Sequence, residues 1–311
     1  MLEIVVSPTS KQFIDRCEYC DAFILGEQHF GLRLAANFTL TEIKEIIPIV
    51  KKRKQKVYIA LNRIIHEDHL SEVDEYLSEI RSLDIDGIIF GDLAVLRLAR
   101  KYNLVEKLIY NPETLITNYE TVRFFSDYGI KRVCLAKEIT LDDIKLIGSK
   151  HRLEIEVLGH GVMNMFHSYR DLLTNYYRFL KHANLEEVRN QELYLIEEHR
   201  TDKYPILEDE HGTHVFSGYD LCTVNYLDDF IENNITAIRI DGLFKDDDTL
   251  LEIVKVYQKA IKDYYDAPSL YKSNKEHYLN LLKNIPRIRP FNDGFLFKKT
   301  IYKGDENSGS K

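Results

Sequence analysis

The sequence is poor in cysteine and has no long hydrophobic run. Its 311 residues include only four cysteines, unevenly spaced, so we expect no disulfide framework and predict the cytoplasm as the compartment. No apolar run approaches the ~18 residues that a membrane-spanning helix needs. Residues 1–6 have no basic region and too short an apolar stretch for a signal peptide. We therefore expect no membrane partner.

Positive charge is in deficit. Lysine and arginine total 42 against 50 acidic residues, which gives a net charge of −8. This balance argues against nonspecific nucleic-acid binding over the whole surface, although it leaves room for a local basic patch. The sequence also has no P-loop, no GxGxxG and no GxSxG. The standard nucleotide-phosphate sites and the nucleophile elbow of hydrolases are therefore not predicted.

Hydrophobic residues make up 44% of the chain, enough for a sizeable buried core. Short β-branched runs recur along the sequence, and most are continuously apolar, which is typical of strands buried on both faces of a parallel sheet. Amphipathic helical patterns alternate with them. The predicted strands cover residues 3–6, 21–25, 56–60, 87–90, 108–110, 132–136, 154–158 and 237–240. The predicted helices cover 9–17, 41–54, 70–83, 93–102, 119–128, 141–149, 226–233 and 249–264.

Eight strand–helix units predict an α/β fold, a (β/α)8 TIM-type barrel, with a doubly wound open sheet as the alternative. We expect the barrel to span residues 1–265. Residues 161–223 form a long α/β insertion between strands seven and eight, with a helix near 169–181 and short strands around a turn at 210–213. Residues 266–303 form a C-terminal extension with one helix, and 304–311 form a disordered tail.

In such barrels the active site lies at the carboxyl ends of the strands. Carboxylates that meet at one mouth push their pKa values apart and supply an acid and a base. Each polar residue at these positions has an alternative role as the N-cap of the helix that follows. The candidates at strand ends are Glu27, Asn62, Asp92, Glu113, Glu138, His160 and Asp241, with Arg33 and Arg170 in loops on the same rim.

Other motifs favour structural roles. The CxxC at 17–20 lies before strand two, at the barrel bottom, and has no second pair. The histidines in 66–69 are three apart, whereas a zinc-protease motif needs four. The basic run 51–54 suits a helix C-terminus. His211 and His214 flank a hairpin turn, where we expect surface histidines. Arginines, lysines and phenylalanines interleave in 287–303, which suits either RNA contact or packing on the barrel.

A set of motifs in order along residues 2–265 resembles the peptidase U32 (collagenase-like) family. The most distinctive is EIEVLGHG at 154–161. The others are 26–33, 36–39, 57–62 with His66, 91–92, 117–118, 132–138, Ser168, Arg170, 175–176, 205–209, 212–213, Ser217, 220–222, 238–242 and Lys245. The match at 117–118 adds Asn118 to the candidate substrate-binding residues.

The departures from the family pattern concern cysteine. Members usually carry cysteines after the His-Gly pair and a further pair downstream, a set that suits an iron–sulfur cluster. Here the upstream positions are Asn164 and Asp171, residues 182–191 contain no cysteine, and Cys222 alone remains nearby. We therefore expect no cluster bound by this chain alone. It is similar to the cysteine-poor, short member of a pair of U32 paralogues found in Firmicutes-type bacteria, which implies a cysteine-containing paralogue as partner.

The resemblance implies three alternative functions. The first is a subunit of a system that hydroxylates C5 of the tRNA wobble uridine, with prephenate as co-substrate, Arg33 and Arg170 as anion partners, and His160 and Glu138 in proton transfer. The second is a collagenase-like peptidase, with Glu27, Asp92, Glu113 and His160 as metal ligands. The third is a noncatalytic partner of the cysteine-containing paralogue. Homo- or hetero-oligomers and tRNA contact fit the first and third.

Overall fold

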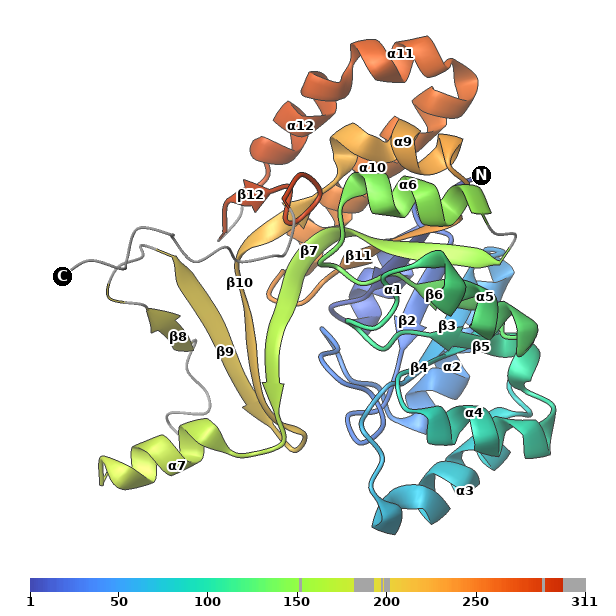
Figure 1. Cartoon of the computed structure of the whole chain (residues 1–311), viewed down its shortest axis with the longest axis vertical. Coiled ribbons are helices and arrows are strands. Elements are labelled where there is room, and N and C mark those ends of the chain that lie inside the picture. The colour runs from blue at the N-terminus through green and yellow to red at the C-terminus, as the bar shows by residue number, and fades with distance from the viewer. Residues whose placement is uncertain (151–152, 182–192, 197, 199–201, 287–288, 299–311) are drawn as a thin grey trace.

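The computed structural model describes residues 1–150, 153–181, 193–196, 198, 202–286 and 289–298. Eight parallel strands close into a barrel (Figure 1). The first strand pairs with both the second and the last, and the last also pairs with the seventh, so no edge is left open. The predicted TIM-type barrel is confirmed, and the open sheet is wrong. The barrel strands are β1 (Glu3–Ser7), β2 (Ala22–Leu25), β3 (Lys56–Leu61), β4 (Gly87–Phe90), β5 (Leu108–Tyr110), β6 (Arg132–Cys134), β7 (Glu154–Ser168) and β11 (Ala237–Asp241).

Alternate residues of each strand face two different cores. The outward set packs against the helices in one large apolar cluster. The inward set forms a small separate cluster inside the barrel, made of Val5, Ala22, Ile24, Tyr58, Ala60, Ile89, Ile109, Cys134 and Ala237. Burial on both faces explains why the strands read as continuous apolar runs.

Helices surround the barrel and begin with clear signals. Helix α2 starts with a capping box in which Thr39 and Glu42 exchange hydrogen bonds, and its residues Ile43, Ile46 and Val50 are buried against the strands. Among the described residues, no helix combines the length and apolarity needed to cross a membrane. The helices around the barrel are α1 (Lys11–Arg16), α2 (Leu40–Lys52), α3 (Leu70–Ile80), α4 (Leu93–Ala99), α5 (Tyr119–Asp127), α6 (Leu141–Lys150), α9 (Leu227–Glu232) and α10 (Asp247–Asp266). Short 3-10 helices are η1 (Glu67–His69), η2 (Arg100–Tyr102), η3 (Val105–Lys107) and η4 (Val224–Tyr226).

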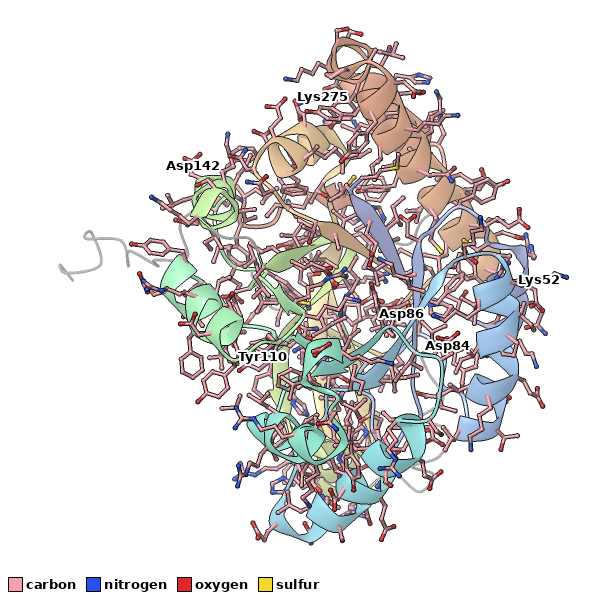
Figure 2. The ribbon with its side chains drawn as sticks, turned by 90° about the vertical axis from the view of Figure 1, so that its right-hand side faces the viewer. Lys52, Asp84, Asp86, Tyr110, Asp142 and Lys275 are labelled. Atoms are coloured by element: carbon pink, nitrogen blue, oxygen red, sulfur yellow. The ribbon has the colours of Figure 1, made fainter. Side chains whose placement is uncertain are left out.

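The basic run 51–54, at the end of α2, lies at the amino-terminal ends of the barrel strands. Figure 2 shows Lys52 at the end of this helix and Asp84 and Asp86 in the segment ahead of β4. Lys51 Nζ lies 2.6 Å from Asp86 Oδ2. Arg53 donates to the backbone carbonyls of Ile14 and Asp15 in the last turn of α1. This end of the barrel is held by local ion pairs and hydrogen bonds.

The predicted insertion is an arm, which we define as residues 161–223. Its elements are the outer part of β7, α7 (Leu172–Phe179), β8 (Leu193–Ile196), β9 (Lys203–Asp209) and β10 (Gly212–Cys222). Strand β7 continues out of the barrel and pairs antiparallel with β10, which pairs with β9 (Figure 1). The far end of the arm returns to the barrel rim, where a ring nitrogen of His211 lies 2.6 Å from the carbonyl oxygen of Gln28.

Two histidines of the arm correct an expectation. His211 and His214 are buried, with 4% and 0% of their surface exposed, and are not surface residues. The ring of His214 stacks on His167 at 4.5 Å and its Nε2 lies 3.2 Å from Asp209 Oδ1. The pairing of β7 with β10 brings His214 against His167, and the contact of the turn with Gln28 brings His211 against the barrel rim. A turn signal in the sequence carries no information about that packing.

The C-terminal extension packs on the barrel and the arm. It contains two helices, α11 (Pro268–Ser273) and α12 (Lys275–Lys283), where the sequence pattern predicts one. The strand β12 (Phe291–Asn292) then pairs with β10. Pro268 begins α11 directly after α10 and so separates the helices. The predicted disordered tail, 304–311, and the basic residues of 299–303 lie outside the described residues.

Candidate functional site

A pocket with an empty volume of about 690 Å³ opens at the carboxyl ends of the barrel strands. Polar side chains from seven segments meet there, and the base of the arm supplies one wall through Val162, Asn164 and Phe216. The polar lining comprises Ser7, Arg33, Asn62, Asn111, Glu113, Lys137, Glu156, Asn164, Arg239 and Asp241. The strand ends thus gather one site, as barrel closure predicts.

Glu113 lines the pocket and bonds two of its cations. Its Oε2 accepts from Lys137 Nζ at 2.6 Å and its Oε1 accepts from Arg33 Nη2 at 3.1 Å. Burial alone would raise the pKa of Glu113, but these two cations hold that pKa well below its ordinary value. Arg33 and Glu113 also both have positive φ, 55° and 69°, a region that non-glycine residues rarely adopt. Strain of this kind clusters at functional sites.

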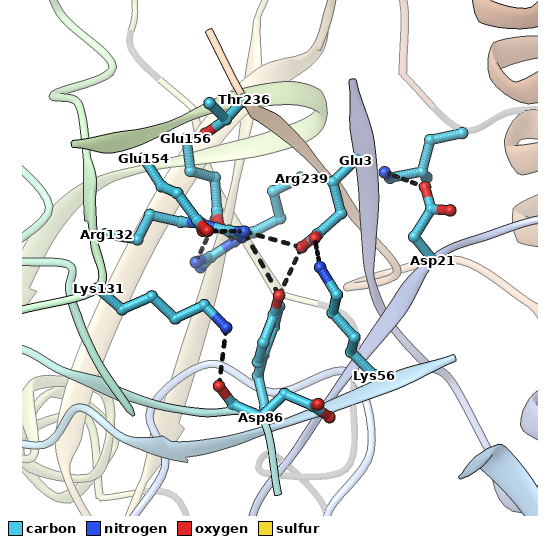
Figure 3. Close-up of polar contacts among 12 residues, drawn as sticks. Glu3, Asp21, Lys56, Asp86, Lys131, Arg132, Glu154, Glu156, Thr236 and Arg239 are labelled. Carbon is cyan, nitrogen blue, oxygen red and sulfur yellow. Dashed lines mark hydrogen bonds and ion pairs between the residues drawn. The ribbon is translucent and has the colours of Figure 1, made fainter. Parts of the chain in front are cut away.

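The floor of the pocket is a buried ion pair. Arg239 Nη2 lies 2.6 Å from Glu156 Oε1, and the other oxygen of Glu156 accepts from Arg132 Nη1 at 3.2 Å. Arg132, 1% exposed, also bonds Glu3, which accepts a hydrogen bond from Tyr58 (Figure 3). Burial would raise the pKa of Glu156, but Arg239 and Arg132 lower it. The floor is therefore charged, paired and rigid.

Three asparagine amides give the pocket neutral hydrogen-bonding groups. Asn62 Oδ1 accepts from the backbone N–H of Leu32 at 2.9 Å, which leaves its amide nitrogen for another partner. Asn164 Oδ1 is buried and has no hydrogen-bond partner among the described residues. A buried acceptor without a partner is rare in folded proteins. The pocket can therefore bind a ligand that places an N–H or O–H donor next to Asn164 Oδ1.

Four of the ten predicted site residues line this pocket: Arg33, Asn62, Glu113 and Asp241. Asp241 Oδ1 also accepts from Leu243 N at 2.9 Å, which fixes the loop after β11.

Three predicted site residues instead accept hydrogen bonds at the N-termini of helices, which is the alternative role expected for such positions. Asp92 caps α4 and Asn118 caps α5 through their side-chain oxygens. Glu27 Oε1 accepts from Leu40 N at the first residue of α2. Two others, Glu138 and Arg170, are exposed and do not line the pocket.

His160 lies apart from the pocket lining. It is fully buried in β7, with Tyr257 Oη 3.4 Å from Nδ1 and the ring of Phe291 at 5.3 Å. Burial lowers the pKa of His160 to about 3, and nearby Lys245 and Arg289 act in the same direction. The imidazole is therefore neutral at pH 7. Its Nε2 has no hydrogen-bond partner among the described residues.

Sequence reasoning missed Lys137, Arg239, Glu156, Asn111 and Asn164. Arg239 lies two residues before Asp241 in β11. Residues two apart in a strand point to the same side, so the predicted Asp241 could have identified Arg239. Glu156 lies further from the carboxyl end of its strand. Lys137 is adjacent to the predicted Glu138, and a shift of one residue decides which side chain faces the pocket. Asn164 belongs to the arm, whose return to the mouth has no local sequence signal.

The cysteines do not fit a four-thiolate cluster. Cys17 and Cys20 lie together, with sulfurs 3.8 Å apart, in the α1–β2 segment. Cys134 lines the mouth pocket, where burial raises its pKa well above the ordinary value. Cys222, the last residue of β10, contacts the hydroxyl of Tyr257 in α10. Among the described residues, which include all four cysteines, no three His, Cys, Asp or Glu side chains gather in a metal-binding group.

Comparison with known proteins places this architecture in a family. Residues 12–305 match the model of peptidase family U32. The chain is 36% identical over 305 residues to tRNA hydroxylation protein P2 of Bacillus subtilis (strain 168), covering 96% of this chain and 99% of that protein. It is 27% identical to tRNA hydroxylation protein P1 of the same strain, over 82% of this chain and 61% of that protein. It is 30% identical to an uncharacterized protease of Methanocaldococcus jannaschii, over 89% of this chain and 68% of that protein. The chain therefore belongs to peptidase family U32.

Proposed function

We propose that this chain is a cytoplasmic subunit of a system that hydroxylates C5 of the tRNA wobble uridine. The observation that carries the proposal is its 36% identity to tRNA hydroxylation protein P2 along nearly the full length of both chains. The second relative of the same kind, protein P1, supports a paralogue as partner. Prephenate stays in the proposal as the co-substrate that the family resemblance implies.

The mouth pocket takes the uracil ring. Its ionisable lining contains three cations, Arg33, Lys137 and Arg239, and three carboxylates, Glu113, Glu156 and Asp241, so the charges balance. A neutral ring suits such a lining better than a dianion does. Uracil offers one N–H donor between two carbonyl acceptors. Asn164 Oδ1, which lacks a partner among the described residues, can accept from that N–H, and amide or ammonium donors can reach the carbonyls.

The test is mass spectrometry of tRNA nucleosides from a strain without the gene, complemented with variants. We expect the 5-hydroxyuridine-type nucleosides to fall in the deletion strain and to return with the parent chain. Asn164→Ala is expected to restore little, because the base loses its acceptor, whereas the exposed control Glu138→Gln restores them fully. Unchanged nucleosides in a strain that also lacks every paralogue would overturn the proposal.

A second role, docking of the cysteine-containing paralogue, is favoured by the apolar face of the arm. In the described part of the chain, a groove with an empty volume of about 1740 Å³ runs between α7 and the arm strands. Several of its side chains are exposed, among them Met165 at 50%, Phe166 at 48% and Tyr176 at 55%. Contiguous apolar surface of this kind marks an interaction site. The partner's own barrel supplies the cysteines that this chain lacks.

Co-expression with the paralogue and affinity capture test this docking. Phe166→Ser combined with Met165→Ser is expected to abolish capture while leaving the thermal stability of the isolated chain almost unchanged, since both side chains are half exposed. The matched control is Phe124→Ser on α5, where the side chain is equally exposed, at 50%, but lies far along the chain from the arm. Equal capture by the double variant and the control would reject the docking surface.

The peptidase alternative has no comparable support in the described residues. Its proposed ligands do not gather, since Glu27 and Asp92 hold helix starts and His160 is buried apart from Glu113. The Cys134 thiol, with its raised pKa, lacks the thiolate character of a nucleophile. Incubation with gelatin, with and without a chelator, tests this alternative directly.

A further inference from the structure

A second cavity, with an empty volume of about 670 Å³, lies between the loop after β11, the start of α10 and the C-terminal segment. It shares no lining residue with the mouth pocket. Its lining comprises Asp220, Phe244, Lys245, Asp246, Thr249, Ile253, Ile285, Pro286, Arg289 and Phe291.

Two buried cations face one buried carboxylate in this cavity. The side chains of Lys245 and Asp220 are only 3% and 4% exposed, and their charged atoms lie 3.1 Å apart. Arg289, 6% exposed, donates from Nε to the other oxygen of Asp220 at 3.1 Å. Burial would raise the pKa of Asp220, but these cations lower it, so the carboxylate stays ionised. These three buried side chains, Lys245, Arg289 and Asp220, therefore carry a net charge of +1.

Among the described residues, Asp220 is the carboxylate that pairs with Lys245 and Arg289, and the fourth ionisable lining residue, Asp246, forms no ion pair with either cation. Asp246 lines the cavity, but it is exposed and its carboxylate caps α10 by accepting from Thr249 N and Oγ1. His160, which faces the same ion pairs, is neutral. Lys245 Nζ is buried and makes no hydrogen bond of good geometry with the described residues, although it has three donors. Burial of an ammonium in this state is unfavourable unless a further acceptor joins it.

The backbone and an aromatic ring hold the cations in place. Phe244, directly before Lys245, has a φ of 61°, a strained conformation for a bulky residue. Its ring lies 5.2 Å from the Arg289 guanidinium carbon and 5.2 Å from the ring of Phe216. Asp220 lies in β10 and Lys245 follows β11, two separate segments of the chain. The closed chain brings them together around this cavity.

We propose that this cavity binds the carboxylate or phosphate group of a small anionic metabolite. Lys245 and Arg289 are the ligands of the anion, and Asp220 positions both cations. The anion supplies the acceptors that Lys245 lacks and neutralises the excess charge. The site is separate from the mouth pocket, because the two cavities share no lining residue. It gives the anionic co-substrate of the proposed function a binding place and rests on that function to this extent, whereas binding of the probes is measured without tRNA and is decided independently.

The test is isothermal titration calorimetry of the full chain with two probes, succinate and inorganic phosphate. We expect at least one to bind with one site per chain, and the tighter probe identifies the group as carboxylate or phosphate. Lys245→Met is expected to weaken that binding about tenfold or more, since a charge-assisted hydrogen bond is lost. Arg33→Gln, in the mouth pocket, and Lys259→Gln, on the surface, are expected to bind as the parent does.

The Asp220→Asn variant is expected to change the affinity for the anion in the opposite direction. It therefore separates a loss of binding from a loss of folding. It removes the competing carboxylate, so we expect the anion to bind more tightly, whereas a site with a structural role only would lose binding in both variants. In the parent chain, the probe is also expected to shift the ¹⁵N resonances of the His160 ring. Absence of binding by both probes, parent-like binding in Lys245→Met, or equal weakening in Arg33→Gln would each overturn the proposal.

Discussion

At the scale of single residues, Glu113 joins the chemistry of the mouth to its stability. It holds Arg33 and Lys137 in place and sits in a strained backbone conformation. A carboxylate that is less than a quarter exposed and bonded to two cations is worth more than a surface ion pair. The same contacts lower its pKa, so its contribution to stability depends on pH.

Glu113→Gln is expected to lower the free energy of unfolding at pH 7 by about 2 kcal/mol, since charge-assisted hydrogen bonds are lost. The folded-state pKa of Glu113 lies below the ordinary 4.5, so its stabilisation is complete above that value and is lost as pH falls below it. The difference between parent and variant should therefore shrink at acid pH. Urea unfolding across pH 3–7 measures it, with exposed Glu138→Gln as the control. A difference that stays constant with pH would contradict the assignment.

Residue identities at the mouth were only partly predictable from the sequence. Arg33, Glu113 and Asp241 could be placed there because barrel closure brings strand ends together. Asp92 and Asn118 occupy equivalent positions but cap helices, and an aspartate or asparagine at such a position suits both roles. Lys137 was missed because neighbouring residues of a loop point in different directions. Backbone geometry, which the sequence does not display, decides between them.

At the scale of elements, β7 combines two structures in one strand. The sequence predicts a strand at 154–158, but the structure extends it to Ser168. The extension is possible because β10 pairs with it antiparallel, a contact between residues about 50 positions apart that no local pattern predicts. The eight barrel strands themselves were predictable, since each needs only a short buried run. The pairing of β7 with β10 in the arm was not predictable.

Gly161 marks the point where β7 leaves the barrel. Its φ is 132°, and a Cβ there would lie 2.8 Å from Cβ of Asp241. Gly161→Ala is therefore expected to cost about 2–5 kcal/mol through strain and crowding together. Gly129→Ala is the matched control: φ is 78°, but no heavy atom lies within 4 Å of the new Cβ, so we expect about 1–2 kcal/mol from strain alone. Thermal or urea unfolding compares the two, and equal losses would contradict the crowding.

At the scale of the whole molecule, one buried arginine connects the first strand of the barrel to later ones. Arg132, in β6, bonds Glu3 in β1 and both Glu154 and Glu156 in β7. These contacts cross the barrel interior beneath the mouth and span the chain from residue 3 to residue 156. They complement the backbone pairing that closes the ring.

Arg132→Met is expected to lower the free energy of unfolding by about 3–5 kcal/mol, because carboxylates are left buried without their partner. Arg123→Met, where the side chain is 67% exposed and pairs weakly with Glu120, is expected to change it by less than about 0.5 kcal/mol. Denaturation in urea, an uncharged denaturant that does not screen ion pairs, measures the free energy of unfolding of both variants. A loss for Arg132→Met no larger than that of the control would show that the network contributes little.

Strand β7 contributes to both the mouth pocket and the apolar face of the arm. Glu156 forms the pocket floor, Asn164 its wall, and Phe166 the exposed face of the arm, all on one continuous ribbon. Because these residues share one strand, a displacement of its arm portion can be transmitted to the pocket. If a partner protein that binds the arm displaces β7, the affinity of the mouth pocket for its ligand changes by some factor. Thermodynamic reciprocity then requires the ligand to change the affinity of the chain for that partner by the same factor.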